Sequence, residues 1–546
     1  MTEDQCMSPE EAELNAAMER VLRSPSPKKL VVAGPGTGKT SLFRELLAST
    51  GGQPDRYVVL TFINNLRDDL EEDLAGLAQV FTLHSFCLGL LHRDATIRAP
   101  LSCDFRCLPG LAHLIGEDWR VIKSGDAPQF VSEMRELEEE SSIPFYLARG
   151  EYYDAVDFDD TVYRVFKGFT SGSAVPDVYN LVLVDEYQDF NRLEAGFIDA
   201  LAAYSPILIA GDDDQALYSQ LRNATWDNIR QLSRDGEFEV FELPYCMRCP
   251  KVVVDAVNDV LSRARALHRL DGRIEKPYKY FPPVKRADSA KYPRIALVET
   301  SVQRANANYM GRYIATAVAA IPPEEIEEAR ARSYPAALVI AAQPYRRQII
   351  SHLENSGFDV EVRQETTSRL DRDLGLAILQ EERDSNLGWR IILDADKPSF
   401  LRDAIAGTAD NTKRIVDVLP QEYRESVLAN VDTYEPPDES KVDLQPESES
   451  PEPLRIRVTS FEGAKGLSAQ HVYIAGLHNN ELPRDPMAIQ DLEICKFVVA
   501  LTRTRKRCSL IYTRNFAGSW RTRSEFIDWI GSARFERVRV DASYRT

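Results

Sequence analysis

The feature that most restricts the fold is a glycine-rich turn close to the amino terminus. Residues 33–40 read AGPGTGKT, directly after the apolar run 30–32 and directly before a helical pattern. A buried strand that leads into such a turn and then into a helix aims successive backbone N–H groups at a polyphosphate. We therefore predict a nucleotide-phosphate loop in an α/β fold with a parallel sheet.

The residues of this turn have separate tasks. Glycine at positions 34, 36 and 38 permits a tight turn and a close backbone approach. Lys39 can reach the β- and γ-phosphates, and the hydroxyl of Thr40 is a candidate Mg²⁺ ligand. Kinases, GTPases, transporters and motors share such a loop, so it does not decide the activity. The predicted nucleotide-binding residues are Gly34, Pro35, Gly36, Thr37, Gly38, Lys39, Thr40 and Ser41.

Length and patterning predict two α/β units. The chain has 546 residues, which is too many for one hydrophobic core. Apolar runs alternate with helical patterns, as in parallel-sheet proteins. The expected strands of the first unit are 57–62, 181–184 and 207–210, and those of the second are 337–340, 455–458, 471–474 and 509–512.

Composition narrows the class of protein further. No run reaches the roughly 20 apolar residues of a membrane span, and the scattered cysteines favour a reducing compartment, so we expect a cytoplasmic protein. The net charge of −19 argues against a protein that coats nucleic acid non-specifically. Charge is uneven, however, because residues 502–523 are basic and residues 432–452 are acidic. A confined basic path for nucleic acid remains compatible with this pattern.

Acidic residues follow two of the expected strands. Asp185 and Glu186 come directly after 181–184, and Gln215 lies in the sequence GDDDQALYS after 207–210. The carboxyl ends of parallel strands meet at one edge of the sheet, where ligands bind. We predict that Asp185 holds Mg²⁺ and that Glu186 orients and deprotonates the attacking water. Gln215 is placed to contact the γ-phosphate and report its loss.

Eight further motifs, in this order, resemble those of the UvrD/Rep family of superfamily 1 helicases. The resemblance covers nearly the whole chain. The motifs are VLTFINN (59–65), FTLHSF (81–86), DFDD (157–160), DEYQD (185–189), GDDDQALYS (211–219), MRCP (247–250), TSFEGAKGLS (459–468) and VALTRTRK (499–506).

The resemblance implies two RecA-like P-loop NTPase domains with inserted helical subdomains and MgATP between them. Arg248 would reach the γ-phosphate, and Arg503 would act as an arginine finger from the second domain. The positions that match the single-strand track of the family are Thr61, Asn64, Thr82, His84 and Tyr218.

The resemblance also predicts how the chain is divided. We expect the first RecA-like domain to comprise residues 1–86 and 168–242, interrupted by a helical subdomain at 87–167 that is similar to the family's 1B. The second RecA-like domain would comprise residues 243–366 and 453–546. A reduced insertion similar to the family's 2B, with an acidic linker, would occupy residues 367–452.

Several positions depart from the family pattern. Glu11 stands where an adenine-reading glutamine is expected, and Met247 stands where an aromatic ring would stack on the base, with Tyr245 displaced nearby. A carboxylate cannot donate to the base as an amide can, so adenine selection should be weak. The insertion at 367–452 is short, which makes processive unwinding a weaker expectation than translocation.

Two functions fit this pattern. The first is a DNA-dependent ATPase that acts as a 3′–5′ helicase or translocase on single-stranded or overhang DNA. The second is an ATP-gated DNA-end sensor that regulates a partner nuclease, as the resemblance to helicase-like subunits of bacterial anti-phage systems such as Gabija implies. A small-molecule kinase, the third class, is disfavoured by Arg248 and Arg503 in their motif context.

Overall fold

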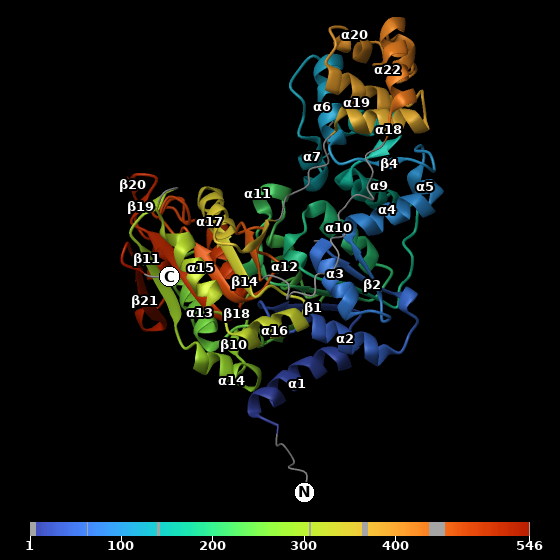
Figure 1. Ribbon diagram of the computed structural model, residues 1–546. Helices are drawn as coiled ribbons and strands as arrows, with labels where there is room; N and C mark the ends of the chain where they lie inside the picture. Colours follow the sequence, from blue (N-terminus) through green and yellow to red (C-terminus); the bar gives the residue numbers. More distant parts are fainter. Residues whose placement is uncertain are drawn as a thin grey trace.

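Two large parallel sheets form the body of the protein (Figure 1). The computed structural model describes residues 7–62, 64–138, 142–304, 307–362, 370–435 and 454–544, without the side chains at 64–66, 220 and 221. Every pairing within the two sheets is parallel. This confirms the predicted α/β class with two RecA-like domains.

The first sheet has the strand order β3-β2-β6-β7-β1-β8. Its central strands are covered on both faces, which explains why they are continuous apolar runs in the sequence. The strands are β1 (Lys28–Ala33), β2 (Tyr57–Thr61), β3 (Gln79–Thr82), β6 (Leu181–Val184), β7 (Ile207–Gly211) and β8 (Glu239–Leu243). The helices of this part are α1 (Pro9–Arg23), α2 (Lys39–Thr50), α3 (Asn64–Asp73), α4 (Leu83–Arg93), α5 (Ala95–Arg98), α10 (Arg192–Ala202), α11 (Ser219–Arg222) and α12 (Asp227–Leu232).

The second sheet has the order β15-β16-β14-β17-β18-β11-β21. The sequence patterns predicted β14, β16, β17 and β18 but not β11 or the two edge strands. The strands are β11 (Ile295–Thr300), β14 (Ala337–Ala341), β15 (Asp359–Val362), β16 (Arg455–Thr459), β17 (Ala469–Ala475), β18 (Thr504–Thr513) and β21 (Phe535–Val540). The helices are α13 (Lys251–Ala266), α14 (Pro282–Lys291), α15 (Tyr309–Ala319), α16 (Pro323–Ala331), α17 (Gln343–Asn355), α23 (Asp491–Thr502) and α24 (Glu525–Asp528).

Short strands complete the sheet inventory. β9 (Tyr245–Cys246) pairs with β10 (Lys279–Tyr280), and β4 (Arg106–Cys107) pairs with β5 (Ala155–Val156). A small sheet beside the second domain contains β12 (Gln303–Arg304), β13 (Ala307–Asn308), β19 (Asn515–Phe516) and β20 (Ser519–Trp520).

The helices of the two insertions form one lobe, which stands at the top of Figure 1. The helices are α6 (Leu111–Ile122), α7 (Phe130–Glu136), α8 (Ser142–Tyr153), α9 (Phe158–Thr170), α18 (Arg372–Glu381), α19 (Asn386–Asp396), α20 (Leu401–Ala406), α21 (Ile415–Val418) and α22 (Gln421–Thr433). One continuous apolar core joins both insertions, from Leu114 and Ile115 in α6 to Trp389 and Ile392 in α19. The expected acidic linker lies largely outside the described residues.

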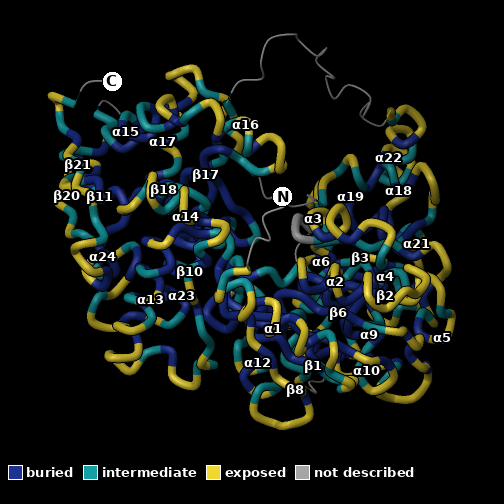
Figure 2. The backbone as a smooth tube through the Cα atoms, turned by 90° about the horizontal axis from the view of Figure 1, so that it is seen from below, coloured by how far each residue is buried: buried dark blue, intermediate teal, exposed yellow. Residues whose placement is uncertain are grey.

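The two RecA-like domains have separate buried interiors. Seen from below, each has its own buried interior around a sheet, and the two interiors lie side by side (Figure 2). Among the described residues, no helix is both long and apolar enough to cross a membrane.

Candidate nucleotide and nucleic-acid site

The predicted phosphate loop lies between β1 and α2. Gly36 and Gly38 have φ angles of +73° and +91°, which a residue with a Cβ rarely adopts. The Thr37 hydroxyl donates to the Gly34 carbonyl at 2.8 Å, which fixes the turn. Lys39 is the first residue of α2, so its ammonium and the free N–H groups of the helix start lie on the same side of the loop.

Asp185 and Glu186 follow β6 and face this loop. The Lys39 ammonium lies 3.5 Å from a Glu186 carboxylate oxygen. Glu186 is a non-glycine residue at φ +55°, a costly conformation of the kind found at functional sites. Burial, and next the charge of Glu186, raise the pKa of Asp185 to about 6. Burial acts in the same direction on Glu186, but Lys39 and Lys465 outweigh it and lower the pKa of Glu186.

A lysine of the TSFEGAKGLS motif (459–468) enters this site from the second domain. Lys465 donates to the Asp189 carboxylate and, at 2.6 Å, to the Gln215 carbonyl. Its ammonium also lies 3.6 Å from Glu186. The sequence analysis did not assign Lys465 a role, although its place in the motif at residues 459–468 could have suggested one. The residue is almost fully buried, so it links the two domains within the acid cluster.

Gln215 and Arg503 are in direct contact across the domain boundary. A guanidinium nitrogen of Arg503 donates to the Gln215 side-chain oxygen at 3.1 Å, and the Gln215 amide donates to Asp212 at 2.8 Å. Arg503 also donates to the carbonyls of Val499 and Leu467, which fixes its direction. Burial, and next the charge of Arg248, lower the pKa of Arg503. The guanidinium nevertheless stays protonated at neutral pH.

Arg248 and Met247 close over the phosphate loop. The Met247 backbone N–H donates to the Gly36 carbonyl at 2.8 Å. A Cβ at Gly36 would lie 2.6 Å from the Arg248 Cβ, so only glycine allows this approach. Arg248 also donates to the Thr502 carbonyl at 3.5 Å, next to Arg503. The two predicted arginines thus lie on the same side of the loop.

Glu11 and Tyr245, which the sequence analysis placed near the adenine base, form hydrogen bonds with other residues of the protein. Glu11 accepts from the Ser8 backbone at 2.8 Å and forms the capping box of α1. The Tyr245 hydroxyl donates to Glu13 at 2.6 Å, and Lys279 donates to the other Glu13 oxygen at 2.7 Å. The sequence analysis missed Glu13, which has no recognisable motif.

Most residues predicted to contact DNA gather at the carboxyl ends of β2 and β3. Thr61 and Thr82 are paired neighbours in these strands, and both are buried. The Thr61 hydroxyl has no hydrogen-bond partner, whereas the Thr82 hydroxyl caps α4. Thr82 is therefore committed to the fold here, and Thr61 retains bonding capacity. The side chain of Asn64, the first residue of α3, lies outside the described residues.

His84 and Tyr218 flank these threonines. A guanidinium nitrogen of Arg222 lies 3.1 Å from the His84 ring, and burial, followed by the Arg222 charge, lowers the pKa of His84 to about 3. Tyr218 packs against Phe62 with ring centroids 5.2 Å apart, and Arg222 lies over the same Phe62 ring. His84, Phe62, Tyr218 and Arg222 therefore form an aromatic and cationic group beside Thr61.

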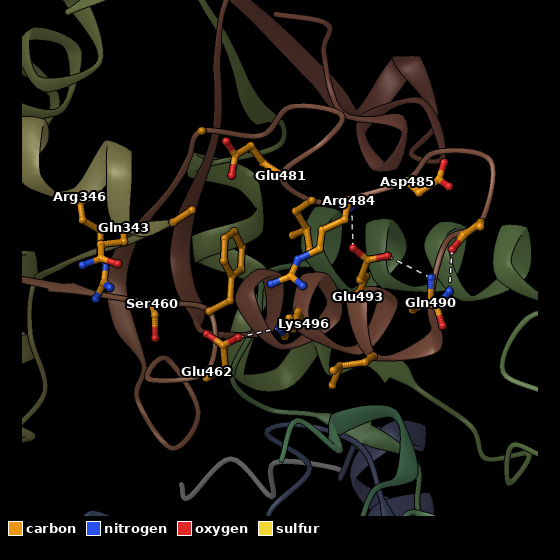
Figure 3. A pocket seen from close by; sticks show the side chains of 16 residues that line it. Gln343, Arg346, Ser460, Glu462, Glu481, Arg484, Asp485, Gln490, Glu493 and Lys496 are labelled. Carbon is orange, nitrogen blue, oxygen red and sulfur yellow. Dashed lines mark hydrogen bonds and ion pairs between the residues drawn. The ribbon is translucent and has the colours of Figure 1, made fainter. Parts of the chain in front are cut away.

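A pocket of about 500 Å³ lies at the carboxyl ends of β14, β16 and β17 (Figure 3). Arg346, Arg484 and Lys496 lie around it, together with acidic residues. Lys496 pairs with Glu462 at 2.6 Å, and the Arg346 Nε has no hydrogen-bond partner. The Tyr218 hydroxyl donates to the Glu462 carbonyl at 3.5 Å, so this pocket adjoins the aromatic group of the first domain.

The residues of the cleft suit MgATP. The loop offers backbone N–H groups and the Lys39 ammonium to phosphates, and Thr40 and Asp185 offer the hard oxygen ligands that Mg²⁺ prefers. A second acidic group, Asp212, Asp213 and Asp214, has ligand-like spacing, but the Lys276 ammonium lies within 2.9 Å of an oxygen from each. This second group holds an ammonium where a metal ion would lie.

Comparison with known proteins finds similarity to the same family. Residues 14–142 and 132–237 match the UvrD/REP helicase N-terminal domain. The chain is 25% identical over 291 residues to the ATP-dependent DNA helicase PcrA of Bacillus subtilis (strain 168), covering 45% of this chain and 39% of that protein. It is 25% identical over 294 residues to DNA helicase II of Haemophilus influenzae, covering 46% and 40%. The similarity to PcrA of Staphylococcus aureus (strain Mu50 / ATCC 700699) is 23% over 291 residues, covering 45% and 40%. The match thus spans about two fifths of each relative's length.

Proposed function

We propose that this chain, which is UvrD/Rep-like through its first RecA-like domain, hydrolyses ATP between its two sheets and thereby moves along single-stranded DNA in the 3′–5′ direction. One observation carries the proposal. A continuous chain of hydrogen bonds runs from Glu186 through Gln188, Asp212 and Gln215 to Arg503. Groups with the chemistry of a general base and an arginine finger are therefore joined across the domain boundary.

The residues of the cleft divide the hydrolytic work. The loop and Lys39 bind the β- and γ-phosphates, and Glu186 takes the proton of the attacking water. Arg503 and Arg248 offset the charge that develops on the γ-phosphate. Thr40 and Asp185 would hold Mg²⁺, which neutralises phosphate charge when it is bound.

Two segments give a physical route from hydrolysis to DNA. Residues 211–219 carry Gln215 in the cleft and Tyr218 in the aromatic group. Residues 459–468 carry Lys465 in the cleft and Glu462 at the pocket of Figure 3. A change at the γ-phosphate therefore moves groups that face both sites. At the pocket, Arg346, whose Nε has no hydrogen-bond partner, would meet the DNA backbone, and the aromatic group would supply rings on which bases stack.

A strand-displacement assay tests this function. Duplex DNA with a 3′ tail, a 5′ tail or no tail is incubated with the protein and ATP, and translocation is followed in parallel by displacement of an end-bound label. We expect activity on the 3′-tailed substrate alone and none with the Lys39→Ala variant. Equal activity on blunt duplex, or activity that persists in Lys39→Ala, would refute the proposal.

One observation favours a second candidate, the ATP-gated sensor that regulates a partner nuclease in anti-phage defence. The helices of residues 370–435 share a buried core with the first insertion, so they cannot swing separately without breaking that core. Single-strand-stimulated ATPase without displacement of any tailed duplex is the result that this candidate predicts.

A further inference from the structure

Lys276, which belongs to none of the motifs, forms an ion pair with Asp212 in the middle of this series of hydrogen bonds. Lys276 lies between α13 and β10, and its side chain is only 3% exposed. Its ammonium lies 2.9 Å from Asp212, 2.8 Å from Asp213 and 2.9 Å from Asp214. The lysine follows the MRCP motif (247–250), whereas the three aspartates follow β7 in the first domain.

The three aspartates do not depend on Lys276 equally. Asp213 also pairs with Arg230 at 3.0 Å, and Asp214 pairs with Arg273 at 2.6 Å. Within the described part of the chain, Lys276 is the only cation within ion-pair distance of Asp212. Removing the Lys276 ammonium therefore leaves Asp212, and not its two neighbours, without an ionic partner.

Both halves of this series of hydrogen bonds, from Glu186 to Arg503, pass through Asp212. Its backbone N–H donates at 2.9 Å to Gln188, which in turn donates to Glu186 at 2.5 Å. Its carboxylate accepts from the Gln215 amide at 2.8 Å. A displacement of Asp212 would therefore displace Glu186 on one side and, through Gln215, Arg503 on the other.

The charge of Asp212 also decides which way the Gln215 amide faces. An ionised carboxylate only accepts hydrogen bonds, so Gln215 must present its NH₂ group to Asp212 and its oxygen to Arg503. A neutral carboxyl could donate its O–H to the oxygen of a reversed amide, which would set the NH₂ group of Gln215 against the guanidinium. Burial raises the pKa of Asp212, and Lys276 gives the strongest opposing influence.

We propose that Lys276 is a positioning residue for ATP hydrolysis, which fixes the Gln215 amide and through it Arg503 by holding the Asp212 carboxylate. This inference rests on the proposed ATPase function. The Lys276 ammonium contacts the three aspartates and acts through them, so its loss should reduce turnover rather than substrate binding. Because it comes from the segment after α13, it also makes the alignment of the cleft depend on the seating of the second domain.

The test compares Lys276→Met with Arg273→Met. Both variants remove one buried cation from the same acidic group, but only the first deprives Asp212 of its partner. We expect Lys276→Met to lower kcat by about 10²-fold, as misplaced catalytic groups do, with KM changed by less than about threefold. Arg273→Met should keep kcat within about threefold, although it removes an ion pair of similar burial. Lys276→Arg, which restores the charge, should recover at least about tenfold of the loss.

The readouts separate the possible failures. Equal kcat losses in Lys276→Met and Arg273→Met, matched by equal losses of melting temperature, would show that the acidic group only holds the domains together. If the wild-type protein hydrolyses no ATP with single-stranded DNA, the proposed function falls and this inference falls with it. If Lys276→Met does not fold, Asp212→Asn takes its place with Asp213→Asn as its control. The inference then requires a kcat loss of about 10²-fold in the first alone.

Discussion

Two buried charge clusters join distant segments of this chain, and they differ in how fully their carboxylates are bonded. In the helical lobe, Asp118 of α6 accepts from Arg149 at 2.6 Å and from Arg390 of α19 at 2.8 Å, and it also accepts from Tyr153. In the cleft, Glu186 lies 3.5 Å from Lys39 and 3.6 Å from Lys465. Both oxygens of the Asp118 carboxylate thus accept hydrogen bonds, whereas both ammonium groups beside Glu186 lie at 3.5 Å or more from its carboxylate.

The difference indicates where a ligand can act. In and beside the cleft, an Asp189 oxygen and the Thr61 hydroxyl are buried without hydrogen-bond partners, and Glu186 holds a costly backbone conformation. Both carboxylate oxygens of Asp118 already accept hydrogen bonds. Burial of charge is thus common to both clusters, and a buried carboxylate oxygen without a hydrogen-bond partner is what distinguishes the one that we assign to catalysis.

We expect the largest effect in the cleft cluster from removing the guanidinium of Arg503, the proposed arginine finger. Arg503→Ala should lower kcat by roughly 10³-fold or more, because it deletes the charge that offsets the transition state. Binding of a fluorescent ATP analogue should change far less. A variant that loses only nucleotide affinity would make Arg503 a ground-state ligand.

Replacing Glu186, the proposed general base, should give the next largest loss of turnover. Glu186→Gln should keep nucleotide binding and reduce turnover by roughly 10²–10⁴-fold, since an amide cannot accept the proton of water. Single-turnover hydrolysis with enzyme in excess measures this step. Near-normal turnover in Glu186→Gln would exclude the residue as the base.

The lobe cluster should respond in the opposite way. Asp118→Ala leaves the buried Arg149 guanidinium without its counter-ion and leaves Arg390 with Asp394 alone, at 3.6 Å, so it should destabilise the lobe by about 3–5 kcal/mol. The kcat measured below the unfolding temperature should stay within about twofold of wild type. Thermal unfolding beside ATPase kinetics separates the two effects, and a large kcat loss in the folded variant would contradict the comparison.

A smaller effect concerns the pocket of Figure 3. Arg346→Met should weaken single-strand binding and lower the slope of log affinity against log salt by about 0.7, because one phosphate contact is lost. Arg347, the next residue, is exposed and does not line the pocket, so Arg347→Met is the matched control. Equal slopes for the two variants would remove the pocket from the DNA path.

The smallest expected effect is a pH dependence of the lobe. Burial raises the pKa of Asp160 in α9 to about 7, above its ordinary value near 4. The folded state therefore binds this proton more tightly than the unfolded state, and the stabilisation is lost as pH rises through 7. Asp160→Asn should flatten the decline in melting temperature between pH 5 and pH 8. An unchanged decline would show that other groups cause it.

The sequence predicted the parts of the molecule that local patterns encode. β1, β6 and β7 are apolar because they are covered on both faces, and Lys39, Glu186 and Gln215 follow them at fixed offsets. The structure brings these three residues together as predicted, whereas their roles stay predictions.

Pairings between distant segments could not be predicted in this way. Lys276 and its three aspartates are more than 60 residues apart, and Asp118 and Arg390 are 272 residues apart. Nothing in the local sequence distinguishes such a lysine or arginine from a surface charge. The edge strands β15 and β21 were missed because solvent-facing residues interrupt their apolar patterns. Glu13 was missed for the same reason as Lys276, since its partners come from β9 and β10.

The central claim is that ATP hydrolysis in the cleft is coupled to single-stranded DNA through segments that face both. Steady-state kcat for ATP, titrated with single-stranded DNA and with blunt duplex of the same length, tests it most directly. The account predicts that single strands raise kcat to a plateau, that blunt duplex has little effect, and that the half-saturating DNA concentration rises with salt. A kcat that is the same with and without single strands would contradict the coupling, even if the cleft hydrolyses ATP.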